Sequence, residues 1–407
     1  MKILQINTVY KSGSTGKIAK DLNDLILKDN HESFIAYSRG EHSEGNCIQI
    51  GNKLDMNLHA LGTRVFDKHG LYSKKATLSF IQKLEKIDPD IIHLHNIHGY
   101  YLNYPILFEY LKKVEKPVVW TLHDCWSFTG HCSHYEYNGC DKWQKECANC
   151  PQLRQYPASL VFDNSKNNFL QKKKFFSSLD NLTIVTPSIW LANEVKKSFL
   201  KDFEIKVINN GIDLDIFQPL DSNFREKYKL ENKFLILGVA SVWEERKGFK
   251  YFIKLSNLLQ YDEKIILIGL SDEQIKSLPS NIIGIKRTEN QEELAQIYST
   301  ADVFVNPTLE DNFPTTNLES LGCGTLVVTF KSGGSPECID DNTGIVVEKG
   351  NLNKLYKAIV TIKENSKEKY TSFCRNRAEE YFDKNDRFKE YLDLYKIKLK
   401  DNKNVQK

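Results

Sequence analysis

The sequence predicts an α/β protein with two domains, each built on a parallel β-sheet. Short, β-branched apolar runs alternate with helical segments along nearly the whole chain, and such units form parallel sheets with helices on both faces. The chain has 407 residues, too many for one typical hydrophobic core. The predicted strands are residues 2–7, 33–38, 90–96, 117–123 and 182–188 in the first half, and residues 234–241, 264–270, 282–287, 302–308 and 325–330 in the second.

The composition excludes several classes of protein. Apolar residues make up 41% of the chain and charged residues 27%, as in soluble globular proteins. The net charge of +3 lacks the concentrated basic excess of a nucleic-acid binder. No apolar run approaches the roughly eighteen residues of a membrane span. The N-terminus reads as a first strand and not as a signal peptide, so the nine cysteines favour a reducing compartment, and we expect a cytoplasmic protein.

The most informative stretch is residues 302–330, where a strand, a polar loop and a helix start are followed by a second strand. The loop reads EDNF, and Pro314 after it suits the first turn of a helix that ends at Gly322 or Gly324. Free N–H groups and the positive dipole end of such a helix form an anion site. Carboxylates in the same place bind hydroxyl groups, so the arrangement suits a nucleotide sugar.

Two acids in this stretch carry a resemblance to a known family. Asp311 and Glu319 are separated by seven residues and are followed by a small-residue turn and a β-branched strand. This pattern resembles the signature of glycosyltransferase family 4, which contains retaining enzymes with the GT-B fold. The family usually has Glu at the first place, so Asp311 is a departure and Glu310 is a rival for its role. An ordinary strand–loop–helix with solvated acids is the alternative. The resemblance implies two Rossmann-like domains with a cleft between them, and no catalytic metal.

The resemblance also covers the cations of residues 238–249. Family members place an Arg and a Lys here to bind the donor diphosphate. Lys247, followed by Gly248, matches the second; the first is missing, and we expect Arg246 to replace it. A diphosphate leaving group needs fixed positive charge because charge builds on it in the transition state. Solvated charges at a helix start are the alternative.

His123 matches a family position near the donor sugar, where it would hydrogen-bond a sugar hydroxyl or the phosphate. A core histidine bonded to backbone is the alternative. The catalytic residues that the resemblance implies are His123, Lys247, Asp311 and Glu319. The donor-binding residues are Gly13, Gly16, Arg246, Lys247, Arg287, Glu310, Asn312, Phe313 and Glu319.

Gly13 and Gly16 follow the first predicted strand, where a Rossmann half brings bare backbone close to a ligand. A simple turn is the alternative. A P-loop is not expected, because Lys11 stands where the Walker pattern needs its first Gly and Ile18 stands where it needs Ser or Thr. Arg287, after another strand, would stack on the nucleobase, bind phosphate or lie solvated.

His93 and His95 share one face of their strand. We expect acceptor contacts or packing for both, with a metal site as the alternative. Four cysteines lie in an insertion at residues 125–157: Cys132, Cys140, Cys147 and Cys150. Structural zinc would stabilise this loop, which has little apolar pattern of its own. Disulfides and free buried thiols are the alternatives. The insertion resembles one in a capsule and lipopolysaccharide branch of family 4, and its position indicates an acceptor-side lid.

The domains are predicted as residues 1–203 on the acceptor side, residues 204–385 on the nucleotide-sugar side, and a C-terminal helix of residues 386–407 that crosses back and frays. Residues 164–179 form a basic aromatic helix that either touches an anionic membrane or caps the first sheet.

The leading interpretation is a retaining hexosyltransferase that moves a sugar from a nucleotide-sugar donor to a glycan or lipid-linked glycan in surface polysaccharide biosynthesis. It would be cytoplasmic, with peripheral contact at the inner face of the membrane. The alternatives are a non-catalytic sugar-nucleotide-binding subunit of a transferase complex and a GT-B nucleotide-sugar epimerase.

Overall fold

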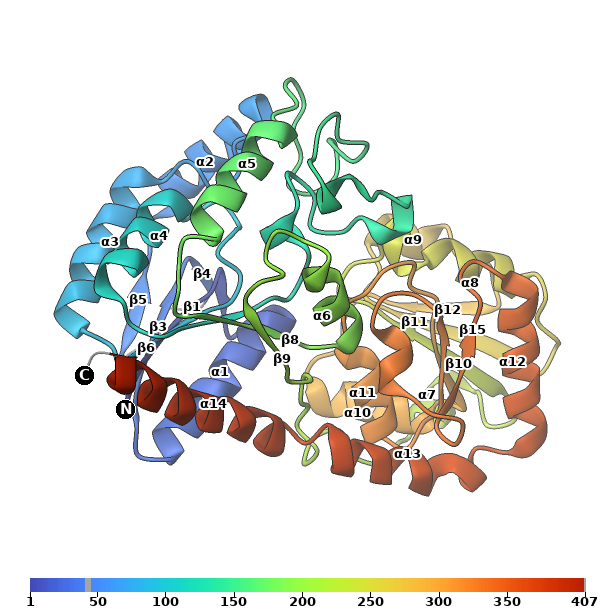
Figure 1. Ribbon diagram of the computed structural model, residues 1–407. Coiled ribbons are helices and arrows are strands. Elements are labelled where there is room, and N and C mark those ends of the chain that lie inside the picture. The colour runs from blue at the N-terminus through green and yellow to red at the C-terminus, as the bar shows by residue number, and fades with distance from the viewer. Residues whose placement is uncertain (41–44, 406–407) are drawn as a thin grey trace. The chain divides into compact units, whose positions relative to one another are not determined.

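The computed structural model describes residues 1–40 and 45–405, which divide into two compact units (Figure 1). Unit 1 comprises Met1–Asn209 and Phe388–Lys407, and unit 2 comprises Asn210–Arg387. Each unit contains one large sheet whose paired strands all run parallel, with helices on both faces. The predicted α/β class with two parallel sheets is confirmed.

The sheet of unit 1 has seven strands in the order β5-β3-β1-β6-β7-β8-β9. Its interior strands β6, β7 and β8 are wholly buried, which explains why their sequences are unbroken apolar runs. A separate pair, β2 and β4, lies beside it. The strands are β1 Lys2–Ile6, β2 Val9–Tyr10, β3 Glu32–Tyr37, β4 Arg39–Gly40, β5 Cys47–Gln49, β6 Ile91–Leu94, β7 Val118–Thr121, β8 Leu182–Thr186 and β9 Glu204–Val207.

Two apolar cores cover the two faces of this sheet. One core packs α3, α4, α5 and α6 against it, and the other packs α1 and the C-terminal part of α14. The helices are α1 Gly13–Lys28, α2 Lys53–Phe66, α3 Lys74–Ile87, α4 Tyr104–Val114, α5 Ser165–Phe176, α6 Ile189–Lys196 and α14 Lys384–Val405. Helix α2 starts at a capping box, in which Asn52 and Asp55 exchange side-chain and backbone hydrogen bonds.

The sheet of unit 2 has six strands in the order β12-β11-β10-β13-β14-β15. The strands are β10 Phe234–Val239, β11 Glu263–Ile268, β12 Ile282–Ile285, β13 Val303–Asn306, β14 Val327–Phe330 and β15 Gly344–Val347. The helices are α7 Phe224–Tyr228, α8 Phe249–Ser256, α9 Asp272–Lys276, α10 Gln291–Thr300, α11 Thr315–Gly322, α12 Leu352–Asn365 and α13 Glu368–Tyr381. The pattern at residues 302–330 predicted β13, α11 and β14 to within about two residues at each end.

The cysteine-rich insertion has a core that its sequence did not indicate. It contains the 3₁₀ turns η1 Trp126–Phe128, η2 Glu136–Asn138 and η3 Lys142–Gln144. Phe128 and Tyr135 pack on Trp143, with ring centroids 5.1 and 4.7 Å from it, and all three side chains are buried. Aromatic packing therefore stabilises this loop. The sequence did not indicate this core because the three aromatic residues stand at positions without a helical or strand period.

None of the helices in the described residues combines the length and the apolar character that a membrane span needs.

Candidate functional site

Each sheet has one point at which the chain reverses its direction of strand addition. In unit 1 the point lies between β1 and β6, and in unit 2 it lies between β10 and β13. A crevice opens at the carboxyl ends of the strands there, and ligands of open α/β sheets bind in it. The residues that follow these four strands are therefore the first candidates.

In unit 2, a cation and an acid meet just after β13. Nζ of Lys247 lies 2.5 Å from Oδ2 of Asp311, with the two side chains 26% and 15% exposed. Nη1 of Arg246 donates to the carbonyl oxygen of Glu310 at 2.9 Å, and the N–H of Leu309 donates to the carbonyl of Arg246 at 2.8 Å. The 3₁₀ turn η4 Glu245–Lys247 is thus fastened to the loop that contains Glu310 and Asp311.

Gly248 explains why a glycine follows Lys247. Its φ is +81°, and a Cβ atom would lie 2.1 Å from the carbonyl oxygen of Pro307. Only glycine fits at this position, because the absence of a side chain lets the backbone of the turn approach Pro307, directly after β13.

The two rival acids of the loop differ in exposure. Glu310 is fully buried, whereas the Asp311 carboxylate is partly exposed beside Lys247. A ligand that arrives from solvent therefore reaches Asp311 more readily. The backbone after β14 also comes close to this loop. A Cβ added to Gly333 would lie 1.9 Å from the carbonyl oxygen of Asp311, and the same oxygen accepts a hydrogen bond from the N–H of Gly334 at 3.0 Å.

Glu319 lies on α11, where Tyr298 orients it. The hydroxyl of Tyr298 donates to Oε2 of Glu319 at 3.2 Å, and burial raises the pKa of Tyr298, so it remains a protonated donor. In the described structure no side chain caps the N-terminus of α11, whose first N–H groups follow Pro314. Sequence reasoning missed Tyr298, because it belongs to the preceding helix.

A buried polar network under α11 was also missed. Nδ2 of Asn306 donates to Oδ1 of Asn317 at 2.8 Å, and Nδ2 of Asn317 donates to Oγ of Ser335 at 3.0 Å. Thr329 bonds the same Ser335 hydroxyl at 2.7 Å. The network ties β13, β14 and η5 Ser335–Cys338 to the helix. In the sequence, an asparagine within an otherwise apolar stretch was the signal that could have revealed this buried network.

The other predicted donor residues of unit 2 are more scattered. Phe313 is buried against Phe382, with ring centroids 5.9 Å apart, and Asn312 is buried next to it in sequence. Arg287 is exposed after β12. Phe313 therefore contributes packing, and only Arg287 of this group extends to solvent.

In unit 1, His95 and His123 lie at the carboxyl ends of β6 and β7. Nδ1 of His95 is 3.1 Å from Nε2 of His123, and Nε2 of His95 is 3.0 Å from Oε1 of Gln5. Burial lowers the pKa of His123 to about 4 and that of His95 well below its usual value. Both rings are therefore neutral near pH 7.

His93 belongs to a different network, on the face of the sheet that α14 covers. Its Nδ1 faces the hydroxyl of Tyr395 at 2.6 Å and its Nε2 faces the hydroxyl of Thr121 at 2.8 Å. Of the two expectations for His93, this burial fits packing.

A third histidine network was not anticipated. Nε2 of His98 lies 2.9 Å from Oδ2 of Asp124, and Nδ1 of His98 lies 3.0 Å from the hydroxyl of Tyr156. Burial raises the pKa of Asp124, but the charge and hydrogen bond of His98 outweigh it and lower that pKa to about 2. Asp124 is therefore ionised and forms an ion pair with His98, whose other ring nitrogen bonds the hydroxyl of Tyr156.

The two predicted glycines lie in the first turn of α1, which starts at Gly13. Gly13 has a φ of +64° and open space around it. A Cβ on Gly16 would lie 3.2 Å from Cγ2 of Val9, so Gly16 allows the helix to approach β2.

The four clustered cysteines line one small cavity of about 10 Å³, and all are free thiols. The N–H of Gly130 donates to Sγ of Cys147 at 3.2 Å, and a hydrogen bond from Cys132 lowers the pKa of Cys150 to about 7. Within residues 1–40 and 45–405, no three His, Cys, Asp or Glu side chains are arranged to hold a metal ion.

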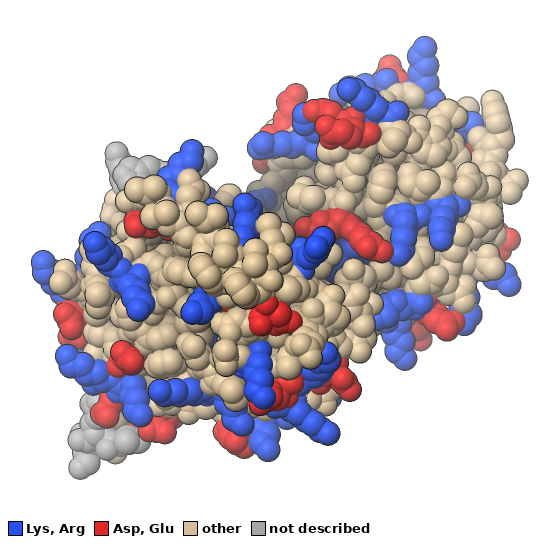
Figure 2. Space-filling model, turned by 90° about the horizontal axis from the view of Figure 1, so that it is seen from above, with Lys and Arg blue, Asp and Glu red and all other residues tan. Residues whose placement is uncertain are grey.

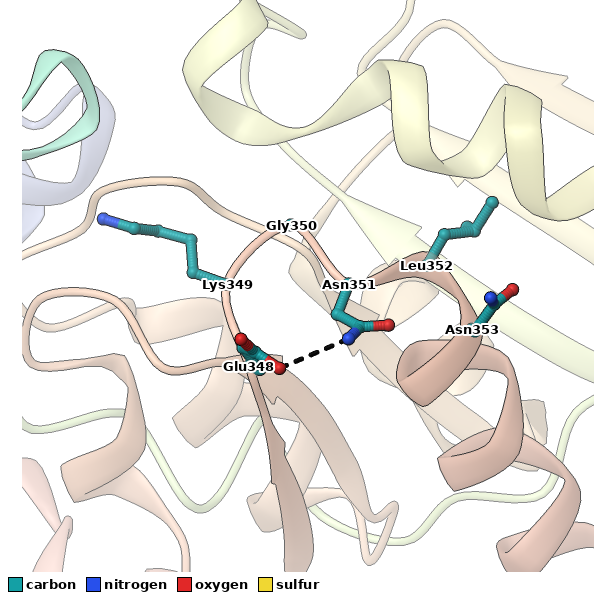
Figure 3. A pocket seen from close by; sticks show the side chains of 6 residues that line it. All are labelled: Glu348, Lys349, Gly350, Asn351, Leu352 and Asn353. Carbon is teal, nitrogen blue, oxygen red and sulfur yellow. Dashed lines mark hydrogen bonds between the residues drawn. The ribbon is translucent and has the colours of Figure 1, made fainter.

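A hollow of about 570 Å³ lies where β15 leads into α12 (Figure 3). Nδ2 of Asn351 donates to Oε2 of Glu348 at 3.2 Å, and Lys354 pairs with the same oxygen at 2.7 Å. Its acid is thus already neutralised, and none of the predicted site residues lines it.

Two units of this kind, each on a parallel sheet, are those of the GT-B fold, and comparison with known proteins agrees. A model described as "Glycosyltransferase Family 4" matches residues 26–216, and one described as "Glycosyl transferases group 1" matches residues 233–365. The chain belongs to glycosyltransferase family 4, as its sequence pattern predicted.

Three similar proteins illustrate this membership. WcaC of Escherichia coli (strain K12), named as a colanic acid biosynthesis glycosyl transferase, is 24% identical over 87% of this chain and 89% of its own. An N,N'-diacetylbacillosaminyl-diphospho-undecaprenol alpha-1,3-N-acetylgalactosaminyltransferase of Campylobacter jejuni is 25% identical over 48% of this chain and 55% of its own. Anabaena Alr3699/HepE, solved with UDP-glucose, is 16% identical with a TM-score of 0.65 over 97% of this chain and 99% of its own.

Proposed function

We propose that this protein is a retaining hexosyltransferase that transfers a sugar from a nucleotide-sugar donor to a glycan or lipid-linked glycan acceptor. The observation that carries the proposal is the pairing of Lys247 with Asp311 at the switch point of unit 2, beside the uncapped start of α11. Cation, carboxylate and free N–H groups at one strand edge suit a ligand that carries phosphates and hydroxyls.

The proposed roles follow from the charges. Lys247 and the N–H groups of α11 bind the diphosphate, which gains negative charge as its bond to the sugar breaks. Asp311 neutralises Lys247 until the donor arrives, and then accepts hydrogen bonds from sugar hydroxyls. Glu319, oriented by Tyr298, accepts hydrogen bonds from the ribose. Family membership supports retention at the anomeric carbon and a reaction without a catalytic metal.

The acceptor is proposed from the relatives. One is named for colanic acid biosynthesis and another for a diphospho-undecaprenol acceptor, so a growing surface polysaccharide on a lipid carrier suits this chain. With such an acceptor, we expect the enzyme to act in the cytoplasm at the inner face of the membrane.

An exposed apolar face of unit 1 supports membrane contact. Leu54, Leu58 and Leu61 of α2 are 65%, 57% and 60% exposed. The adjoining segment 160–162 is exposed as well, and it is fastened to α2 because the N–H of Leu160 donates to the carbonyl of Arg64 at 2.7 Å. Phe162 of this segment stacks on Phe66, with ring centroids 5.9 Å apart.

The charges around this face favour an anionic bilayer as the partner. Exposed Lys166, Lys173 and Lys174 lie on α5, whereas Lys172 of the same helix is buried. Viewed from above, the surface of the molecule carries Lys and Arg, with some Asp and Glu, among uncharged side chains (Figure 2). A second copy docked face to face would bring like charges together, whereas anionic lipid attracts them.

Vesicle co-sedimentation tests this contact. Leu58→Ser with Leu61→Ser should lower binding to phosphatidylglycerol vesicles, and wild type should bind phosphatidylcholine vesicles weakly. Tyr261→Ser, at an exposed position of unit 2, is the control. Equal binding by wild type and the double variant would exclude this face.

Donor binding and hydrolysis test the function. In a panel of nucleotide sugars, one should raise the melting temperature, because it binds only the native state. That donor should be hydrolysed slowly without acceptor, and NMR of the transferred sugar should show retained configuration. Binding without hydrolysis would favour a non-catalytic subunit, and an epimerised nucleotide sugar would favour an epimerase.

A further inference from the structure

Two exposed arginines of unit 1 lie near the ring of Tyr100. Nη2 of Arg39, in β4, donates to the carbonyl oxygen of Gly99 at 3.0 Å, and its guanidinium carbon lies 5.9 Å from the centre of the Tyr100 ring. Burial raises the pKa of the Tyr100 phenol, and the charges of Arg64, on α2, and of Arg39 oppose this rise. Both cations therefore lie around one aromatic ring at the surface of unit 1.

The surroundings of Tyr100 fix this ring between the two cations. Its φ is +72°, an uncommon backbone conformation for a bulky residue, and such conformations gather at ligand-binding sites. The ring lies 4.8 Å from that of His69 and 5.9 Å from that of His59, measured between centroids. His59 belongs to α2, and Arg64 follows it by about 7.5 Å along the helix axis.

Arg64 also borders the exposed apolar face of unit 1. Leu61 stands three positions before it on α2, so the two side chains are neighbours on the helix surface. The carbonyl of Arg64 accepts the N–H of Leu160 at 2.7 Å. In the same segment Tyr156 is 42% exposed, with its ring centroid 6.0 Å from that of Tyr100. The apolar face and the two arginines thus form one continuous surface.

We propose that Arg39 and Arg64 bind the diphosphate of a polyprenyl-linked acceptor whose lipid chain lies in the bilayer beside the exposed apolar face of unit 1. This proposal rests on the proposed function. Each guanidinium presents a planar fork of N–H groups that matches the oxygens of a phosphate, so two arginines match a diphosphate. Within the described residues no carboxylate forms an ion pair with either arginine. A phospholipid headgroup offers one phosphate to the same forks, and the experiment separates the two lipids.

Binding to two kinds of anionic vesicle tests the site. Phosphatidylcholine vesicles carry either undecaprenyl diphosphate or enough phosphatidylglycerol to give the same charge, and wild type should bind the diphosphate vesicles more tightly. Arg39→Gln and Arg64→Gln should each weaken that binding about tenfold or more, because each removes charge-assisted hydrogen bonds to phosphate. Lys83→Gln removes one exposed charge from α3 and is the control, which should bind as wild type does.

Conservative variants separate recognition of the diphosphate from attraction to the membrane. Arg39→Lys and Arg64→Lys keep the positive charge but lose the planar fork. After thermal melting has shown that they are folded, they should bind diphosphate vesicles more weakly and phosphatidylglycerol vesicles as wild type does. Equal binding of wild type to both vesicles, or full binding of diphosphate by the Lys variants, would overturn the proposal. Intact diphosphate binding without any sugar transfer would refute the proposed function but not this site.

Discussion

Replacing Lys247 by Met removes one charge while it keeps most of the side chain. Lys247 and Asp311 are only 26% and 15% exposed, so their environment is partly desolvated. At an effective dielectric of about 20, two unit charges about 4 Å apart interact by about 4 kcal/mol. Loss of one preorganised electrostatic donor costs about 2.7–4 kcal/mol of transition-state stabilisation, a loss of about 100- to 1,000-fold in turnover. Lys247→Met should therefore lower kcat by about this factor.

The control for this variant lies three residues further along the chain. Lys250 pairs with Glu245 at 3.2 Å, but these side chains are 45% and 63% exposed. Such a surface pair contributes at most about 1 kcal/mol, so Lys250→Met should have nearly wild-type activity. Donor hydrolysis by both variants is compared after thermal melting has shown that both are folded. Equal activity of the two variants would refute the assignment of Lys247 to the diphosphate.

Three further predictions concern other side chains. Glu319→Gln should weaken binding of free UDP, whereas Asp311→Asn should leave it nearly intact and lower turnover; equal losses of UDP affinity, measured by calorimetry, would refute this division. If the clustered thiols close around zinc, metal analysis should find about one ion per chain in protein purified without chelator, and Cys147→Ser should lose it; metal-free folded protein would end the zinc proposal. Burial lowers the pKa of Lys172 to about 7, far below its value in the unfolded chain. Between about pH 7 and 10.5 the unfolded state therefore binds more protons than the folded state, so Lys172 makes the free energy of unfolding rise with pH in this range. Lys172→Met should flatten that rise in urea unfolding measured at pH 7 and pH 9, and an unchanged slope would contradict it.

The sequence predicted the interior strands of both large sheets and the edge strand β12, but it missed the other three edge strands. Residues 302–330 succeeded because β13 and β14 are buried on both faces and the turn residues between them are distinctive. Strands β5, β9 and β15 were missed because edge strands are half-exposed and carry a weaker apolar pattern; β9, for example, has no buried residue.

The histidine networks could be predicted only in part. His95 and His123 could be predicted as candidate site residues because they follow strands. Their partner Gln5 left a signal, a polar residue inside an apolar strand, that was not used. Tyr156 could not be paired with His98, because 58 positions separate them and the insertion has no regular period. Such contacts are set by tertiary packing.

The C-terminal part of α14 gives unit 1 an unusual order of assembly. Tyr395 and Tyr391 supply the hydroxyls that face His93 and Thr121 inside unit 1, at 2.6 and 3.1 Å. During synthesis, all of Asn210–Arg387 leaves the ribosome before these tyrosines do. Unit 2, which is continuous in sequence, can therefore complete its core first. Unit 1 must wait with only α1 on one face of its sheet, and a fragment that ends at Asn209 would keep the part of that face that α14 covers exposed permanently.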